Sequence, residues 1–281
     1  MATIQAFIKR HPLLTYFALT FAISWGAILI AVGPSGIPVN TEQVAMLGLA
    51  TLLGPSAAGI LSTGLVDGRA GFRELLARLL RWRVGARRYA VALLTAPLST
   101  AAVLLALSLL SPEFLPGIFT TDDKATLLLF GIVAGLMVGF FEELGWTGFA
   151  VPRMRLRYSV LATGLIVGLL WGAWHFILFW ESDSFSRALS LALLLGRLFS
   201  WLPAYRVLMV WVHDHTDSLL AAMLMHVSLV ASTVILEPPL AGGPLLTYIL
   251  VRAAVLWVVV AAVAVAGGGQ LLREPIAGQG A

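Results

Sequence analysis

Eight long apolar segments dominate this 281-residue chain. A helix needs about 20 mostly apolar residues to cross the hydrocarbon core of a bilayer. The segments are Leu13–Val32, Val44–Val66, Tyr89–Leu110, Ala125–Val151, Val160–Trp180, Ala188–Val212, Ser218–Leu236 and Leu245–Ala266. They are too long and too uniformly apolar for barrel strands, which have about 10 residues of alternating polarity. The sequence therefore predicts an all-α polytopic membrane protein, a bundle of about eight transmembrane helices.

The composition excludes the other common classes. Hydrophobic residues make up 59% of the chain and charged residues 11%, whereas soluble domains have about 25% charged residues. Disordered chains are poor in apolar residues, so disorder is excluded as well. The chain has no cysteine, which excludes a disulfide-stapled scaffold.

The basic residues predict how the chain is oriented. With the N-terminus inside, most of the 18 Lys and Arg residues fall in inner connections, as the positive-inside rule requires. The largest basic patch, Gly68–Arg88, has leucines at helical spacing and is expected to form an amphipathic helix on the membrane surface. We therefore expect both termini to be cytoplasmic. The net charge of +4 indicates membrane lipids as partners and requires no nucleic acid.

Three regions are expected along the chain. Residues 1–124 hold three spans and the basic segment 68–88, residues 125–236 form a core, and residues 237–281 hold the last span and a loose tail that starts at Gly267. Within the core, Gly131, Gly135 and Gly139 repeat every four residues. This spacing is typical of a small-residue face for close helix packing.

A few ionisable residues lie inside the predicted spans, where they are costly. The acidic pair Glu142-Glu143 and the histidines His175 and His226 are the strongest candidates for a site, because glutamate and imidazole together can bind a divalent metal or activate a water. Two structural alternatives that need no active site stay open at this point. The helix can end near Phe141 and leave both carboxylates wet, and each histidine can be structural.

Two features bear on whether these residues meet. Adjacent helical positions diverge by about 100°, so Glu142 and Glu143 are expected to serve different partners. His175, counted from Val160, comes out roughly 8–10 Å deeper than Glu142 and His226, so convergence requires a tilted or late-starting span, or a span boundary that differs by several residues.

Three arginines also lie within spans. Arg206 and Arg252 are about two turns from a span end and are expected to snorkel to the interface. Arg197 lies deeper and is expected to have an acidic partner.

These residues resemble the CPBP intramembrane proteases, a family that includes type II CAAX prenyl endopeptidases and bacterial bacteriocin-processing or immunity-related members. The family pattern has a Glu-Glu pair, an aromatic residue four positions before a His, and a final His. Here these are Glu142-Glu143, Trp171 with His175, and His226. Two positions depart from the pattern: Thr147 replaces the usual Arg, and Val230 replaces the usual Asn.

The resemblance implies an enzyme, an intramembrane metalloendopeptidase that hydrolyses peptide bonds of membrane-associated peptides or proteins. Glu142 would act as general base, His175 and His226 would position water, stabilise the oxyanion or ligate a metal, and Glu143 would orient the group. Zn²⁺ or another divalent ion on Glu142, His175 and His226 is expected, although the same residues can act without it. The resemblance also places the protein in a bacterial cytoplasmic membrane. We further hypothesise that Arg197 supplies the counter-charge lost at Thr147.

Two other functions fit the sequence. Thr147 and Val230 favour a family member that no longer cleaves and acts as a membrane scaffold or immunity factor. The buried Glu and His residues would also suit the relay of an ion-coupled transporter, but no inverted repeat is apparent.

Overall fold

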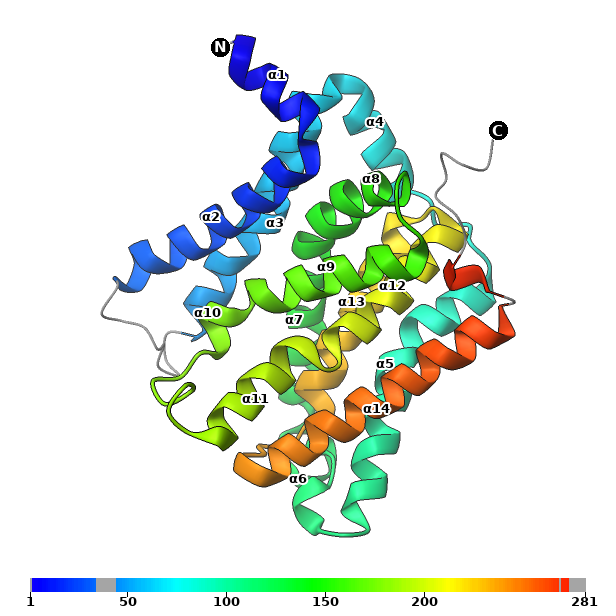
Figure 1. The fold of residues 1–281 in the computed structure, drawn as a ribbon. Helices are drawn as coiled ribbons and strands as arrows, with labels where there is room; N and C mark the ends of the chain where they lie inside the picture. Colours follow the sequence, from blue (N-terminus) through cyan, green and yellow to red (C-terminus); the bar gives the residue numbers. More distant parts are fainter. Residues whose placement is uncertain (1, 34–43, 268, 273–281) are drawn as a thin grey trace.

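A computed structural model describes residues 2–33, 44–267 and 269–272, and within them it contains helices and no strand. The N-terminal part consists of α1 (Ala2–Arg10), α2 (Pro12–Val32), α3 (Val44–Val66), α4 (Gly68–Leu79), α5 (Ala86–Ser108), the short 3₁₀ helix η2 (Pro112–Phe114) and α6 (Gly117–Thr120). Figure 1 shows α2 and α3 on one side of the later helices and α5 on the opposite side, next to α14.

The second half of the chain provides the helices around the candidate site. They are α7 (Lys124–Gly145), the π-helical η3 (Trp146–Ala150), α8 (Val151–Arg155), α9 (Val160–Trp174), α10 (Phe176–Phe179), α11 (Ala188–Phe199), α12 (Leu202–Thr216), α13 (Leu219–Leu236), α14 (Gly242–Ala266) and η4 (Gln270–Leu272). Residues 268 and 273–281, in the tail expected to be loose, lie outside the described residues.

Six helical segments of the described chain are long and apolar enough to cross a membrane, which establishes an all-α polytopic protein. This is fewer than the eight spans expected. Of the two other expected spans, Val44–Val66 coincides with the 23-residue helix α3, and Val160–Trp180 appears as the shorter apolar helix Val160–Trp174. The helix Val160–Trp174 is short because α9 ends at Trp174 with His175 as its C-cap, and the following apolar residues form α10 separately.

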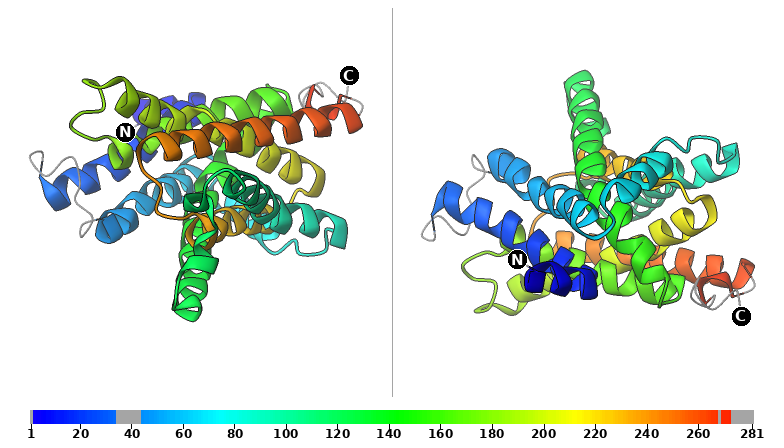
Figure 2. Two further views of the ribbon diagram at one scale, coloured as in Figure 1. Left: turned by 90° about the horizontal axis from the view of Figure 1, so that it is seen from below. Right: turned by 90° about the horizontal axis from the view of Figure 1, so that it is seen from above.

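The glycine face of α7 packs against α13, as the four-residue spacing predicted. A Cβ atom on Gly135 would lie 2.6 Å from the carbonyl oxygen of Val227, and one on Gly139 would lie 2.9 Å from the carbonyl oxygen of Met223. Only glycine permits backbones this close. Figure 2 shows that α7 (green) nevertheless extends away from the rest of the bundle. The packing with α13 fixes the end of α7 that carries the acidic pair.

Capping residues begin several of these helices. The Asp123 carboxylate accepts a hydrogen bond from the Thr126 backbone N–H at 3.0 Å, and hydrogen bonds with the Thr126 hydroxyl and amide lower the pKa of Asp123. The Ser159 hydroxyl likewise accepts from the Ala162 N–H at the start of α9. Such caps satisfy amides that a helix leaves unpaired in its first turn.

The basic segment 68–88 is only partly the surface helix expected. The helix α4 ends at Leu79, and residues from Ala86 onward belong to α5. Leu75 is buried in a cluster with Leu144, and Arg78 is buried and donates to the Gly148 carbonyl oxygen at 3.2 Å. The helix is therefore docked on the protein beneath η3. Figure 1 places α1, α4, α8 and the end of α14 toward the same side of the bundle; which side faces the cytoplasm stays a prediction.

Candidate active site

The acidic pair lies in the last turn of α7 and is buried. Glu142 is 2% exposed and Glu143 is fully buried. The helix does not end near Phe141, because α7 continues to Gly145 and then widens into the π-helical turn η3. Such turns are rare and occur frequently at functional sites. The alternative in which both carboxylates are wet is therefore wrong.

The two carboxylates point to different partners, as their adjacency on a helix predicted. Glu142 Oε2 accepts a hydrogen bond from the indole N–H of Trp171 on α9 at 2.7 Å. Glu143 turns instead toward α12 and α13, where Arg206 Nη1 donates to both of its oxygens at 2.8 and 2.9 Å. The Thr147 hydroxyl, one turn later, donates to Glu143 as well.

The two histidines are each held through Nδ1. His226 Nδ1 lies 2.8 Å from Glu143 Oε1, and His175 Nδ1 lies 2.8 Å from the carbonyl oxygen of Trp171. A carbonyl or an ionised carboxylate can only accept, so both Nδ1 atoms are assigned as N–H donors. In the neutral imidazoles, Nε2 is therefore an acceptor on both rings. Both imidazole rings also make edge contacts with the Trp171 ring, with distances between ring centroids of 5.4 Å for His175 and 5.2 Å for His226.

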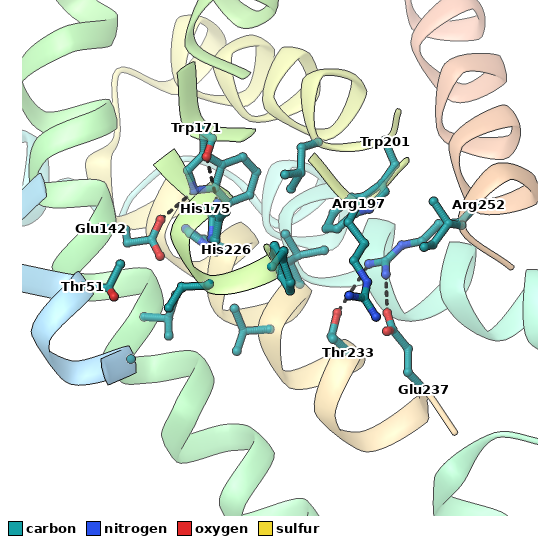
Figure 3. A pocket seen from close by; sticks show the side chains of 18 of the residues that line it. Thr51, Glu142, Trp171, His175, Arg197, Trp201, His226, Thr233, Glu237 and Arg252 are labelled. Carbon is teal, nitrogen blue, oxygen red and sulfur yellow. Dashed lines mark hydrogen bonds and ion pairs between the residues drawn. The ribbon is translucent and has the colours of Figure 1, made fainter. Parts of the chain in front are cut away.

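Glu142, His175 and His226 line one cavity of about 530 Å³, together with Trp171 and Trp174. Figure 3 shows Glu142, Trp171, His175 and His226 gathered on one side of it. The three residues therefore converge although α9 begins at Val160, as expected, so a late-starting span is not the reason. Glu143 does not line the cavity and contacts it through His226.

Arg206 is the cation of the site, and this corrects two expectations. It is fully buried rather than snorkelling, and its guanidinium stacks 4.3 Å from the Trp171 ring. Arg197 was expected to neutralise Glu142 and Glu143. Its Nη1 instead lies 3.5 Å from Oε1 of Glu181. Arg252 also does not snorkel: it is 3% exposed and paired with Glu237.

Sequence reasoning missed Arg206 and the role of Trp171 as a donor to Glu142. The signal for Arg206 was its position in an apolar run, which by itself cannot distinguish a buried ion pair from a snorkelling side chain. The signal for Trp171 was its spacing of four residues from His175, which places the two side chains on one helix face.

The donor chemistry of the site suits a metal, but its arrangement does not complete a ligand group. Histidines that bind metals typically donate the second ring nitrogen to a carbonyl or carboxylate, as His175 and His226 do. In the part of the chain that the structure describes, however, no three His, Cys, Asp or Glu side chains lie close enough together to hold an ion. The expected metal site on Glu142, His175 and His226 therefore stays a prediction.

Comparison with known proteins bears on the same segment. A family model described as type II CAAX prenyl endopeptidase Rce1-like matches residues 124–232. The CAAX prenyl protease 2 of Methanococcus maripaludis is 36% identical over 67 residues, which are 24% of this chain and 23% of that relative. The segment 124–232 is thus similar to CAAX proteases.

The matched segment, residues 124–232, contains every residue named as a candidate for the site: Glu142, Glu143, His175 and His226. It also contains Arg206 and the departures at Thr147 and Val230. The match spans about a quarter of the relative's length. It supports the resemblance seen in the motifs, and the division of the remaining chain into regions stays a prediction.

Proposed function

We propose that this chain is an intramembrane endopeptidase in which Glu142 activates the attacking water. The observation that carries the proposal is the meeting of Glu142, His175 and His226 on one cavity, in a segment that matches a protease family. Among the described residues, Oε2 of Glu142 accepts a hydrogen bond from Trp171, and no hydrogen bond to Oε1 is seen. The second oxygen is thus the one assigned to accept a proton from water.

In the proposed reaction, the two histidines form hydrogen bonds with the oxyanion and with the attacking water. When Glu142 takes the proton, the water oxygen forms a bond to the scissile carbonyl carbon and the carbonyl oxygen becomes an oxyanion. For this step the scheme requires a proton on each nitrogen of His226: Nδ1–H donates to Glu143 and Nε2–H donates to the oxyanion. His175 accepts a hydrogen bond from the water through Nε2 and orients it. The proton on Glu142 then passes to the leaving amine as the C–N bond breaks.

Arg206 and Glu143 act as positioning residues in this scheme. Glu143 holds His226 in one tautomer and orientation, and Arg206 keeps Glu143 ionised in a buried setting where an unpaired carboxylate is unfavourable. Thr147 donates the remaining hydrogen bond. In this chain, Arg206 from α12 provides the positive charge that the family pattern places at position 147.

A cleavage assay tests the proposal. Detergent-purified protein is incubated with a quenched fluorescent peptide library, and wild type is compared with Glu142→Gln. The amide keeps the acceptor for Trp171 but cannot take a proton, so we expect cleavage to fall on the order of 10²–10⁴-fold. Glu113→Gln is the matched control, because Glu113 is exposed and does not line the cavity. This variant should cleave at the wild-type rate. Equal rates for wild type and Glu142→Gln would refute the role of Glu142.

A second candidate function is peptide binding without cleavage. It is favoured by Val230, which lines the cavity with an apolar side chain where the family pattern has Asn. Folded wild-type protein that binds library peptides but cleaves none of them above the Glu142→Gln background would establish this function instead.

A further inference from the structure

A second hollow of the molecule is a groove between α5 and α14, which lie next to each other in Figure 1. Its volume is about 510 Å³, and no described residue lines both this groove and the cavity of the candidate active site. On α5 the lining residues extend from Arg87 to Ser99, and Val255 and Val259 contribute from α14. We call this feature the α5–α14 groove. The proposed reaction uses none of its residues.

The walls of the α5–α14 groove are apolar along most of its length. The apolar lining residues are Ala90, Val91, Leu94, Leu98, Val255 and Val259. The hydroxyls of Thr95 and Ser99 also line the groove, but they donate to carbonyl oxygens of α5 itself, at 2.7 Å to Val91 and 2.6 Å to Thr95. Because these hydroxyl protons are already used, the walls suit a hydrocarbon chain better than a polar ligand.

The length of the groove fits one leaflet of a bilayer. From Arg87 to Ser99 it follows α5 for about 18 Å, at about 1.5 Å per residue, and half of the hydrocarbon core is about 15 Å thick. Past Ser99 the two helices share a buried apolar cluster, which includes Leu104 of α5 and Ile249 of α14. The groove is therefore closed at its apolar end and open at Arg87, which is exposed.

The open end of the groove carries positive charge. Arg87 lines the groove itself, and Arg83 and Arg88 are exposed close by in the sequence. Arg81 is paired with Asp217 at 3.0 Å, but among the described residues the other three arginines have no acidic partner. They directly precede or begin the apolar span of α5, which places them at the membrane surface, where lipid headgroups lie.

We propose that the α5–α14 groove binds one anionic phospholipid, with an acyl chain between the two helices and the headgroup phosphate at Arg87. Guanidinium and phosphate form paired, charge-assisted hydrogen bonds. A lipid fits better than a peptide or a second copy of the chain, because only a lipid matches apolar walls one leaflet deep that end in a cluster of cations.

The bound lipid would also support the frame of the candidate active site. The Leu93 carbonyl oxygen of α5 accepts a hydrogen bond from the Ser228 hydroxyl of α13 at 2.6 Å. His226 lies on the same helix, α13. A ligand that binds only the folded protein raises Tm, so the anionic lipid should raise Tm more than a zwitterionic lipid does.

Native mass spectrometry of the detergent-purified protein tests the proposal. The protein is titrated with phosphatidylglycerol or with phosphatidylcholine that has the same acyl chains. We expect the first phosphatidylglycerol to bind about 5- to 10-fold more tightly than the first phosphatidylcholine. Equal affinity for the two lipids would overturn the proposal.

Two variants change different parts of the site. Arg87→Gln should bring the affinity ratio of the two lipids close to one, and Arg187→Gln, which removes an exposed arginine outside the groove, should keep the wild-type ratio. Ala90→Trp fills the groove and should weaken both lipids. Its matched control is Ala102→Trp, at an exposed alanine of α5 that does not line the groove, and this variant should bind both lipids as wild type does.

The variants also state what would contradict the site. A wild-type ratio in Arg87→Gln would refute the headgroup assignment, and wild-type binding in Ala90→Trp would refute the groove. A lipid-free dimer that Ala90→Trp abolishes would overturn the proposal in favour of a second copy of the chain. None of these measurements requires peptide cleavage, so the lipid site and the proposed endopeptidase function can fail separately.

Discussion

Replacing Arg206 with methionine tests the central ion pair of the site. Methionine keeps a long side chain in the buried position but leaves Glu143 without its cation. Both side chains are fully buried, and Arg206 Nη1 donates to both carboxylate oxygens at 2.8 and 2.9 Å. Removing one partner of a buried pair costs about 3–5 kcal/mol. At about 2–4 °C per kcal/mol, Tm should fall by roughly 6–20 °C.

Thermal unfolding in detergent, followed by tryptophan fluorescence, measures this change. Arg187→Met is the matched control: Arg187 is 77% exposed, and its contact with Asp183 is 3.7 Å long. Exposed pairs of this kind contribute about 0–1 kcal/mol, so the control should unfold close to wild type. A Tm for Arg206→Met equal to that of the control would refute the reasoning.

Two further variants show whether the loss comes from the stranded charge. Adding Glu143→Leu to Arg206→Met removes the unpaired carboxylate, so the double variant should be more stable than Arg206→Met alone. Adding Thr147→Arg instead returns a cation to a position whose side chain already reaches Glu143, and this should recover part of the lost Tm. If the double variant with Glu143→Leu is as unstable as the sum of the single changes, the two residues are not coupled.

Three other predictions follow from the site. Trp171→Phe removes the donor to Glu142 and should lower kcat/KM on the order of 10- to 100-fold with little loss of folded protein, which kinetics and thermal unfolding check together. In Gly172→Ala, the new Cβ would lie 1.9 Å from the Leu198 carbonyl oxygen; α9 must shift against α11, so we expect a loss of about 1–3 kcal/mol in stability and displacement of His175, seen as reduced cleavage. If Glu142, His175 and His226 hold Zn²⁺ as expected, the purified protein should contain stoichiometric metal by elemental analysis, and EDTA should abolish cleavage that added Zn²⁺ restores; a metal-free protein with an unchanged cleavage rate would contradict this.

The four candidate residues were accessible from sequence because charge is expensive in an apolar span. Glu142, Glu143, His175 and His226 stood out for that reason, and the structure brings all four into one network. The same reasoning failed for Arg206. An arginine about two turns from a span end has a long side chain that can reach water or a buried partner equally well, and only the rotation of α12 toward α7 decides between these outcomes.

Span counting was limited in a similar way. The apolar run Val160–Trp180 reads as one crossing, but the chain turns at His175 and divides it into α9 and α10. Hydropathy averages over this turn, because the residues on both sides are apolar. The turn nevertheless positions the histidine at the cavity.

The sequence by itself determined the class of the protein, the approximate limits of its helices, the packing face at Gly131, Gly135 and Gly139, and the motif residues. These depend on quantities that accumulate along the chain, namely apolar length, residue spacing and the cost of a charge in hydrocarbon. Tertiary structure alone decided that Arg206 neutralises Glu143 and that Trp171 donates a hydrogen bond to Glu142. It also decided that Arg197 and Arg252 line the same cavity as the candidate residues. Each of these depends on how far neighbouring helices are rotated, and since one residue turns a helix by about 100°, small differences in rotation select entirely different partners.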